Sequence, residues 1–178
     1  EFTNAGHTSA SGDAGRYAAK SFWRYVLMSD APDVLTVGHD DWHAKLVGRT
    51  PDGRQFFITQ PFEPGDKDFI VRYLFDSDGR FLEATIHDLG QRSSGEPPGN
   101  ALQENADAET LQQQLLAELG NVQFGNIKVR PFSHASNGTE FGLIAQPPED
   151  DEDEWTVVAE PGNYMAFYSP WDDGEYDT

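Results

Sequence analysis

The chain has 178 residues, of which 37% are hydrophobic and 12% aromatic, so it has too much buriable surface for a disordered protein. Its formal net charge is −19, and residues 131–178 hold 12 Asp and Glu but no Lys or Arg, which disfavours direct binding to nucleic acid or to a membrane. The absence of Cys excludes disulfides, thiolate catalysis and zinc–thiolate sites, and no run of about 18 apolar residues predicts a membrane span.

The first 15 residues are small and polar and predict a flexible tail, in which Glu1-Phe2 resembles a cloning remnant. They lack the basic and apolar regions of a signal peptide, so a cytoplasmic location is expected unless a signal was removed upstream. Residues 16–178 are expected to form one domain.

A first amphipathic helix is expected over residues 16–28, where apolar side chains recur at helical spacing. From His39 the period becomes two, which predicts a hairpin closed by Pro51-Asp52-Gly53 and a second one closed by Asp76-Ser77-Asp78-Gly79. The second turn has the oxygen ligands of a calcium loop, but it lacks the further ligands that an EF-hand requires, so a turn is favoured. Four antiparallel strands follow from this pattern.

Residues 91–105 are rich in Ser, Gly and Pro and predict a linker. A second amphipathic helix is expected over residues 107–119, with Asp107 as its N-cap and Gly120 as its stop. Four more strands are expected between residues 123 and 168. The predicted fold class is therefore α+β, a mostly antiparallel sheet of about eight strands with two amphipathic helices.

The second half of the chain resembles the first. At an offset of 85 residues, Gly53 aligns with Gly138 and Phe56 with Phe141. This predicts a duplicated α-β-β-β-β unit with pseudo-repeats at 16–90 and 106–178. The alternative is a chance match between two strand-rich segments.

The densest group of metal-binding residue types is the sequence HDDWH, residues 39–43. On a strand, His39, Asp41 and His43 would share one face, while Trp42 would point into the core. Two imidazoles and a carboxylate on one face could bind Zn²⁺ or another divalent metal ion. The alternative is an exposed polar face next to a buried Trp.

The C-terminal segment interleaves aromatic and acidic residues, a mixture typical of binding surfaces. The candidate partner-binding residues are Tyr164, Trp171, Asp172, Asp173, Glu175, Tyr176 and Asp177. The alternative is that the aromatic side chains fill the core and the segment packs down as a cover. The acidic run at 149–154 is expected to be a solvated loop, although it could bind a cation or a basic surface.

We expect a non-enzymatic acidic protein that docks on a basic protein partner, as inhibitors or immunity proteins cover a cationic enzyme. The chain has no nucleophile elbow and no glycine-rich phosphate loop that would indicate an enzyme. One alternative is a metal-dependent hydrolytic domain built on the His39 cluster, with His87 as a further ligand and Asp40 or Asp88 carrying protons. A second alternative is a salt-tolerant scaffold domain. No cofactor other than such a metal is expected, and the oligomeric state is left open.

Overall fold

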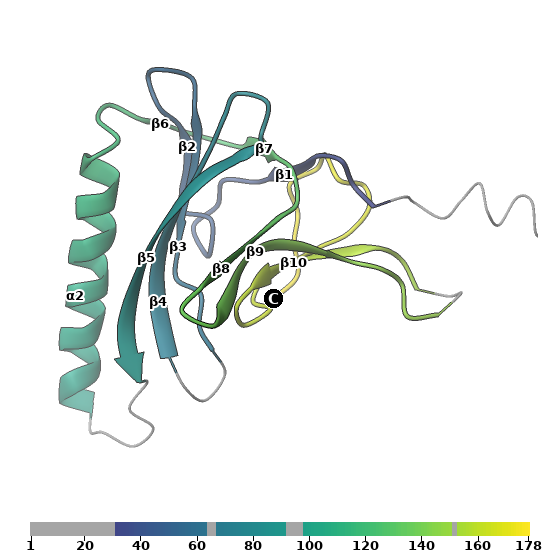
Figure 1. Ribbon diagram of the computed structural model, residues 1–178. Coiled ribbons are helices and arrows are strands. Elements are labelled where there is room, and N and C mark those ends of the chain that lie inside the picture. Colours follow the sequence, from purple (N-terminus) through teal and green to yellow (C-terminus); the bar gives the residue numbers. More distant parts are fainter. Residues whose placement is uncertain (1–30, 64–66, 92–97, 151–152) are drawn as a thin grey trace, which may run out of the picture. The chain divides into compact units, whose positions relative to one another are not determined.

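A five-stranded antiparallel sheet forms the centre of residues 31–178 (Figure 1). The computed structural model describes residues 31–63, 67–91, 98–150 and 153–178, with only the backbone of residues 98–106. In spatial order the strands are β5 (Phe81–Gln91), β4 (Lys67–Phe75), β3 (Gln55–Thr59), β2 (Leu46–Arg49) and β6 (Gln123–Phe124). Successive side chains of a strand point to opposite faces. Phe56 and Phe57 are both fully buried, so both faces of this sheet are covered.

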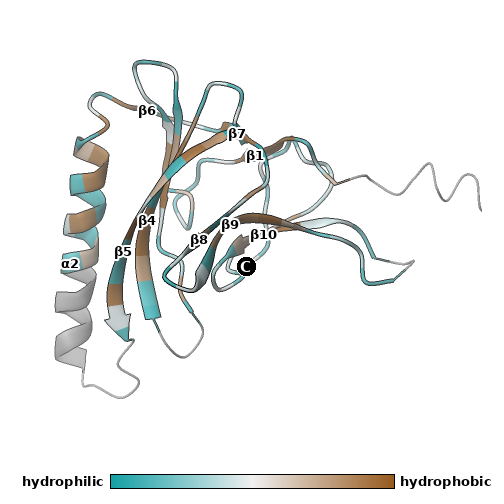
Figure 2. Cartoon of the chain, viewed as in Figure 1, coloured by the Kyte–Doolittle hydropathy of each residue, from teal (hydrophilic) through white to brown (hydrophobic). Residues whose placement is uncertain are grey.

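Helix α2 (Pro98–Ala117) covers one face of this sheet (Figure 1). Hydrophobic and hydrophilic residues alternate along its described turns, as in a helix with one buried face (Figure 2). The residues buried between helix and sheet are Phe56, Ile58, Ile70, Leu74, Ala108 and Leu115. Arg72 of β4 also reaches this layer, where its guanidinium donates hydrogen bonds to Glu118 at 2.6 Å and to the Leu115 carbonyl at 3.3 Å.

A four-stranded antiparallel sheet packs on the opposite face of the central sheet. In chain order its strands are β8 (Phe132–Ser136), β9 (Thr139–Gln146), β10 (Thr156–Glu160) and β11 (Ala166–Phe167). Asn137 and Gly138 close the first hairpin with φ angles of 52° and 88°, the left-handed values that an Asn-Gly type I′ turn requires. Phe141 lies in the core between the two sheets, with its ring centroid 5.1 Å from that of Phe69.

A short third ladder lies at one end of this core. Strand β1 (Leu35–Val37) pairs antiparallel with β7 (Ile127–Val129). The buried Gln55 side chain ties this pair to the central sheet, because it accepts a hydrogen bond from the Lys128 N–H at 2.9 Å and donates one to the Lys128 carbonyl at 2.8 Å. This ladder fixes the start of the loop that follows β1.

The predicted fold class is wrong in its element content. The described residues contain one helix and eleven strands, instead of two amphipathic helices and about eight strands. The helix expected over residues 16–28 lies outside the described residues. Two four-stranded meanders are present, but β1, β6 and β7 have no place in a duplicated α-β-β-β-β unit. Only the mostly antiparallel character of the sheet is confirmed.

The single described helix begins earlier than predicted. It starts at Pro98, so Asp107 lies within it and much of the expected linker at 91–105 is helical. Proline is well suited to the first turn of a helix, and the residues after Asn100 are mostly good helix formers. The Ser-, Gly- and Pro-rich composition of residues 91–105 is typical of a linker and therefore did not predict this helix start. At the other end, Gly120 has a φ of 76°, as expected for a helix stop.

Candidate functional site

Residues 39–43 lie in a loop between β1 and β2 and do not form the strand that their spacing predicted. The Asp40 carboxylate fixes this loop, because its Oδ1 atom accepts hydrogen bonds from the backbone N–H of Trp42 at 2.7 Å and of Ala44 at 3.0 Å. Ala44 is buried, whereas the Trp42 side chain is 69% exposed. The prediction that Trp42 lies in the core is wrong, since an Asp that caps its own loop competes with the strand conformation.

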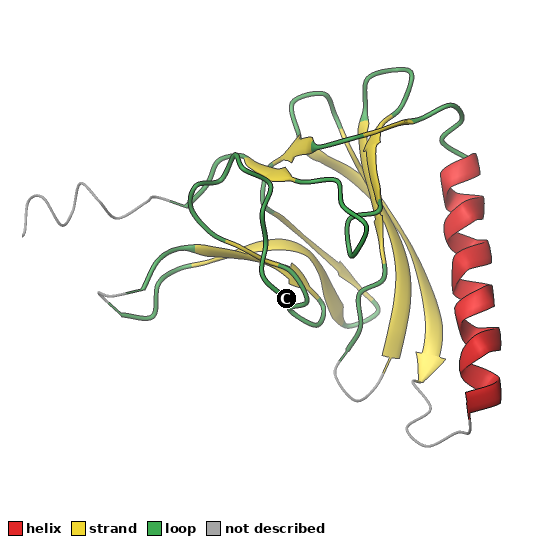
Figure 3. Ribbon diagram, turned by 180° about the vertical axis from the view of Figure 1, so that it is seen from behind, coloured by secondary structure: helices red, strands yellow, loops and turns green. Residues whose placement is uncertain are grey.

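The C-terminal segment, residues 168–178, is built into the fold as a loop that contacts β1 and then β11 (Figure 3). Where it meets β1, the Thr36 N–H donates to the Trp171 carbonyl at 2.7 Å. Near its end, Ala166 and Asp177 exchange two backbone hydrogen bonds at 2.9 and 2.8 Å. The acidic C-terminal segment is therefore held at both ends by backbone contacts.

A close approach of two glycines joins this segment to the start of the Trp42 loop. The Gly38 N–H donates to the Gly174 carbonyl at 3.2 Å, and a Cβ atom at Gly38 would lie only 2.6 Å from the Gly174 oxygen. Gly174 has a φ of 83°, which favours glycine. Glycine at both positions lets the two chain segments touch.

A hydrogen-bond network around Tyr176 completes the junction. The Tyr176 hydroxyl donates to Asp40 Oδ2 and accepts from the His43 backbone N–H at 3.3 Å. Burial and the bond to Asp40 raise the pKa of Tyr176 to about 12. Partial burial alone would raise the pKa of Asp40, but hydrogen bonds from Tyr176 and from the backbone N–H groups of Trp42 and Ala44 outweigh it and lower that pKa. The carboxylate is thus held in its charged form.

These contacts enclose a depression of about 390 Å³, which we call the acidic hollow. Its lining includes Asp40, Trp42, Asp173, Glu175 and Tyr176, and no Lys or Arg within the described part of the chain. Two segments that the sequence singled out separately therefore meet here. An aromatic face next to carboxylates provides the two groups that attract a cationic side chain.

The three predicted metal ligands do not converge. The His43 ring packs inward with its centroid 5.4 Å from that of Tyr164, whereas the exposed His39 packs on Phe124 at 5.8 Å. Among the residues that the structure describes, no group of three or more His, Asp or Glu side chains is placed to hold one metal ion. The prediction for His39, Asp41 and His43 relied on strand geometry, which this loop does not have.

The other residues of the metal hypothesis lie elsewhere. His87 and Asp88 are on β5 in the central sheet, and Asp88 forms an ion pair with Lys67 at 3.2 Å. A hydrogen bond from the Gly90 N–H, together with Lys67, lowers the pKa of Asp88. This carboxylate therefore has a partner in its own sheet and does not line the acidic hollow.

The predicted partner-binding residues form two groups, aromatic residues that are buried or partly buried and acidic residues that are exposed. Tyr164 is only 6% exposed, and its hydroxyl is 3.1 Å from that of Thr59. Trp171 and Tyr176 are partly buried against the core. The carboxylates point outward, and the exposed residues are Asp172, Asp173, Glu175 and Asp177. The aromatic residues thus anchor the segment, and the exposed aromatic face is supplied by Trp42.

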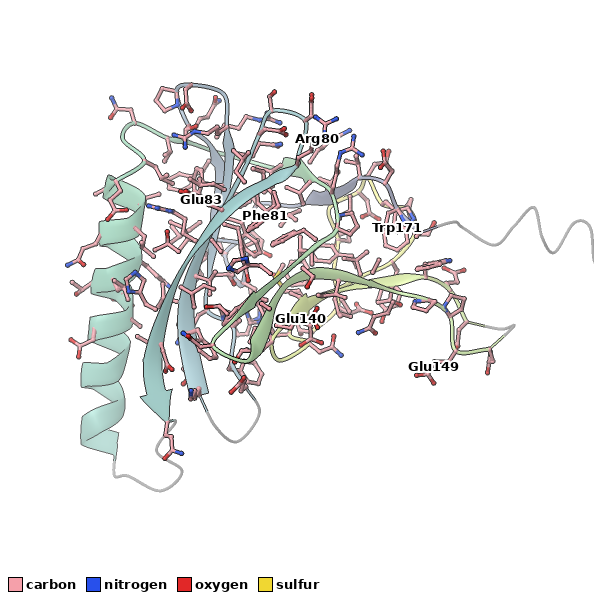
Figure 4. All side chains as sticks on the ribbon, viewed as in Figure 1. Arg80, Phe81, Glu83, Glu140, Glu149 and Trp171 are labelled. Carbon is pink, nitrogen blue, oxygen red and sulfur yellow. The ribbon has the colours of Figure 1, made fainter. Side chains whose placement is uncertain are left out.

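The other acids of residues 131–178 that the structure describes do not line this hollow. Glu140 lies on β9 and Glu149 in the loop that joins β9 to β10 (Figure 4), and neither is a lining residue of the hollow. Among the described acids of the C-terminal quarter, Asp173 and Glu175 are therefore the ones that line the hollow together with the exposed Trp42.

Sequence reasoning missed the structural role of Asp40 and the contact between Gly38 and Gly174. The hydrogen bond from Tyr176 to Asp40 spans 136 positions, so no local pattern could reveal it. A local signal did exist for the loop itself, because an Asp two residues before Trp42 is typical of a side chain that caps a turn.

No protein-family model, curated protein or solved structure matches the chain. In the described part of the chain, no helix has the length and apolar character needed to cross a membrane.

Proposed function

We propose that the chain is a non-enzymatic acidic protein that docks on a basic surface of a partner protein, in the manner of inhibitors and immunity proteins. The observation that supports this is the exposed Trp42 side chain, which lines the acidic hollow together with Asp173 and Glu175. The cytoplasmic location expected from the sequence stays a prediction.

The chemistry of the hollow favours a Lys or Arg side chain of the partner. A cation over an indole face gains about 0.5–2 kcal/mol, depending on desolvation. The two carboxylates add hydrogen bonds, and an arginine guanidinium can bind a carboxylate through two of them. Residues 131–178 contain no Lys or Arg to compete for these groups. Negative potential around the site also speeds encounter with a cationic partner.

Hydrogen bonds within the chain hold the backbone around the hollow. Asp40 caps the Trp42 loop, and Gly174 contacts Gly38 directly. A surface that is fixed before binding loses less conformational entropy when its partner arrives. Trp is also among the residue types that most often act as energetic hot spots of protein interfaces.

The test is affinity capture from a lysate of the source organism at about 50 mM and about 300 mM NaCl, because this change of ionic strength weakens pairing between exposed charges. We expect a basic protein that is retained better at low salt. Trp42→Ala and the double variant Asp173→Asn/Glu175→Gln should each weaken its binding roughly tenfold or more, as hot-spot residues do.

Two controls separate the hollow from general acidity. Glu149→Gln/Asp150→Asn removes the same net charge outside the hollow, and Tyr168→Ala removes an aromatic side chain that is 44% exposed and does not line it. Both should keep binding close to the wild type. Equal loss in the two double variants would show that net charge alone attracts the partner, and the hollow would then not be the docking site.

A further inference from the structure

A second depression lies on the other side of Trp42, between α2 and the ends of β2 and β3. One part has a volume of about 300 Å³ and is lined by Trp42, His43, Thr59 and Gln112, among others. An adjoining part of about 760 Å³ continues along α2. The two parts share Lys45, Leu46, Glu109 and Gln112 in their linings, so we treat them as one polar groove.

The charge of the polar groove differs from that of the rest of the surface. Its described lining contains one cation, Lys45, and one carboxylate, Glu109, so the charges of these described residues cancel in a chain of net charge −19. A cationic ligand would gain less electrostatic attraction in this groove than in the acidic hollow. A strongly anionic ligand would meet a single Lys within a negative field. The groove therefore favours a neutral ligand.

Hydrogen-bonding groups of both kinds surround the groove. The side-chain amides of Gln60 and Gln112 each provide donors and an acceptor. Burial lowers the pKa of His43, and the nearby Asp40 raises it only in part, so the imidazole is neutral at neutral pH and adds no charge to the groove. Hydroxyl groups act as donor and acceptor at once, so a polyhydroxylated ligand matches this mixture.

An apolar floor and an exposed indole complete the groove. Leu46, Ile58 and Ala108 lie among its lining residues, and Trp42 stands at the end next to the acidic hollow. The face of an indole is electron-rich and attracts weakly positive C–H groups, such as those on the flat side of a sugar ring. Ligand sites commonly combine an apolar or aromatic wall with a few polar groups that fix orientation.

We infer that the polar groove binds a neutral saccharide chain, with one sugar ring stacked on Trp42 and the following rings along α2. Gln60, Gln112 and Glu109 bind its hydroxyl groups. The site is separate from the acidic hollow except for Trp42, which lines both.

The test is isothermal titration of the full chain with neutral hexasaccharides of glucose, mannose, galactose and N-acetylglucosamine. We expect at least one to bind with a dissociation constant below about 1 mM. Trp42→Ala should weaken that binding about tenfold or more, as loss of an aromatic anchor does. Gln112→Ala, which removes one amide, should weaken it by a smaller factor.

Two variants serve as controls, and thermal melting confirms that every variant is folded. Tyr168→Ala removes an exposed aromatic side chain outside the groove, and Asp173→Asn/Glu175→Gln alters only the acidic hollow; both should bind the saccharide as the wild type does. The inference is overturned if no hexasaccharide binds, or if Trp42→Ala binds as tightly as the wild type. Neither result would overturn the docking proposal, because its test measures capture of a basic protein and, besides Trp42→Ala, uses the variant Asp173→Asn/Glu175→Gln, which leaves the groove unchanged.

Discussion

The described residues before position 131 and those after it use charge differently. In the first region, basic side chains neutralise nearby acids: Arg54 pairs with Asp52 at 2.9 Å, and Arg80 with Asp78 at 3.1 Å. The second region has no Lys or Arg, and its C-terminal segment is held by aromatic packing and backbone hydrogen bonds. Charge in the first region is largely balanced locally, whereas in the second it remains available to a partner.

The largest expected effect tests whether the two regions share one core. Phe141 of β9 is 1% exposed and packs against Phe69 of β4. Phe141→Ala should lower the free energy of unfolding by about 3–5 kcal/mol, the usual cost of such a truncation in a core. Chemical denaturation measures this loss. One cooperative transition is expected, because the space left by the Phe141 side chain is bordered by both sheets.

Tyr168→Ala is the matched control for this prediction, because Tyr168 is an aromatic residue of the same region with 44% of its surface exposed. It should change stability by less than about 0.5 kcal/mol. Two separate transitions in the Phe141→Ala variant would contradict a shared core and would make the regions independent units.

The second prediction concerns charge used for structure. Arg72 is 8% exposed, and its guanidinium binds Glu118 and the Leu115 carbonyl under α2, and Thr85 at 3.0 Å. Arg72→Ala should cost about 2–3 kcal/mol, because several hydrogen bonds from one charged group are lost in a mostly buried place. Urea denaturation followed by circular dichroism would measure it.

Arg80→Ala provides the comparison for Arg72. The Arg80 side chain is 60% exposed and pairs with Asp78 on the surface, so its removal should cost less than about 1 kcal/mol. A similar cost for the two variants would show that burial does not distinguish the ion pairs of the first region.

The third prediction tests the junction between the regions. Asp40→Asn should lower stability by about 1–2 kcal/mol at neutral pH, since the charged acceptor of the Tyr176 hydroxyl is lost. The folded pKa of Asp40 lies below its ordinary value of 3.8, so its contribution is complete above that pH and is lost as the pH falls through the lower folded value. The difference between variant and wild type should therefore shrink below about pH 3.8.

Denaturation curves measured across the acidic range would show this convergence. Asp41→Asn is the control, because Asp41 is the exposed neighbour and does not line the acidic hollow; it should match the wild type at every pH. A constant difference between Asp40→Asn and the wild type down to the most acidic pH would mean that the charge of Asp40 does not stabilise the junction.

Local patterns predicted part of the fold and no more. Short apolar runs between turn signals predicted β3 and β4, because a strand that is buried on both faces is apolar along most of its length. The two-residue β6 and the three-residue β7 are defined by pairing with distant partners, and their own sequences carry too little periodicity. The helix start at Pro98 was missed because residues that favour linkers also suit a helix N-terminus.

The candidate site could be predicted only as two separate pieces. Composition singled out residues 39–43 and the acidic C-terminal segment, but their contact depends on the close approach of Gly38 to Gly174. The direction of Trp42 depends on whether Asp40 caps its loop or joins a strand, and both are compatible with the same alternating pattern. The orientation of the Trp42 side chain therefore could be known only from the tertiary structure.

The smallest expected effect concerns repulsion among the exposed carboxylates. The variant Asp172→Asn/Asp173→Asn/Glu175→Gln/Asp177→Asn should be more stable than the wild type at low salt by about 0.2–1 kcal/mol, the scale measured for exposed charge pairs. Salt screens such repulsion, so raising NaCl to about 1 M should stabilise the wild type more than the variant. Thermal melting at both salt concentrations measures the two effects.

Neutralising Asp52 and Asp78 instead should give no such gain in stability, because Arg54 and Arg80 already balance the charges of these two residues. If both sets of substitutions stabilise the chain equally, then total charge governs its response to salt, and the contrast between the two regions has no energetic consequence.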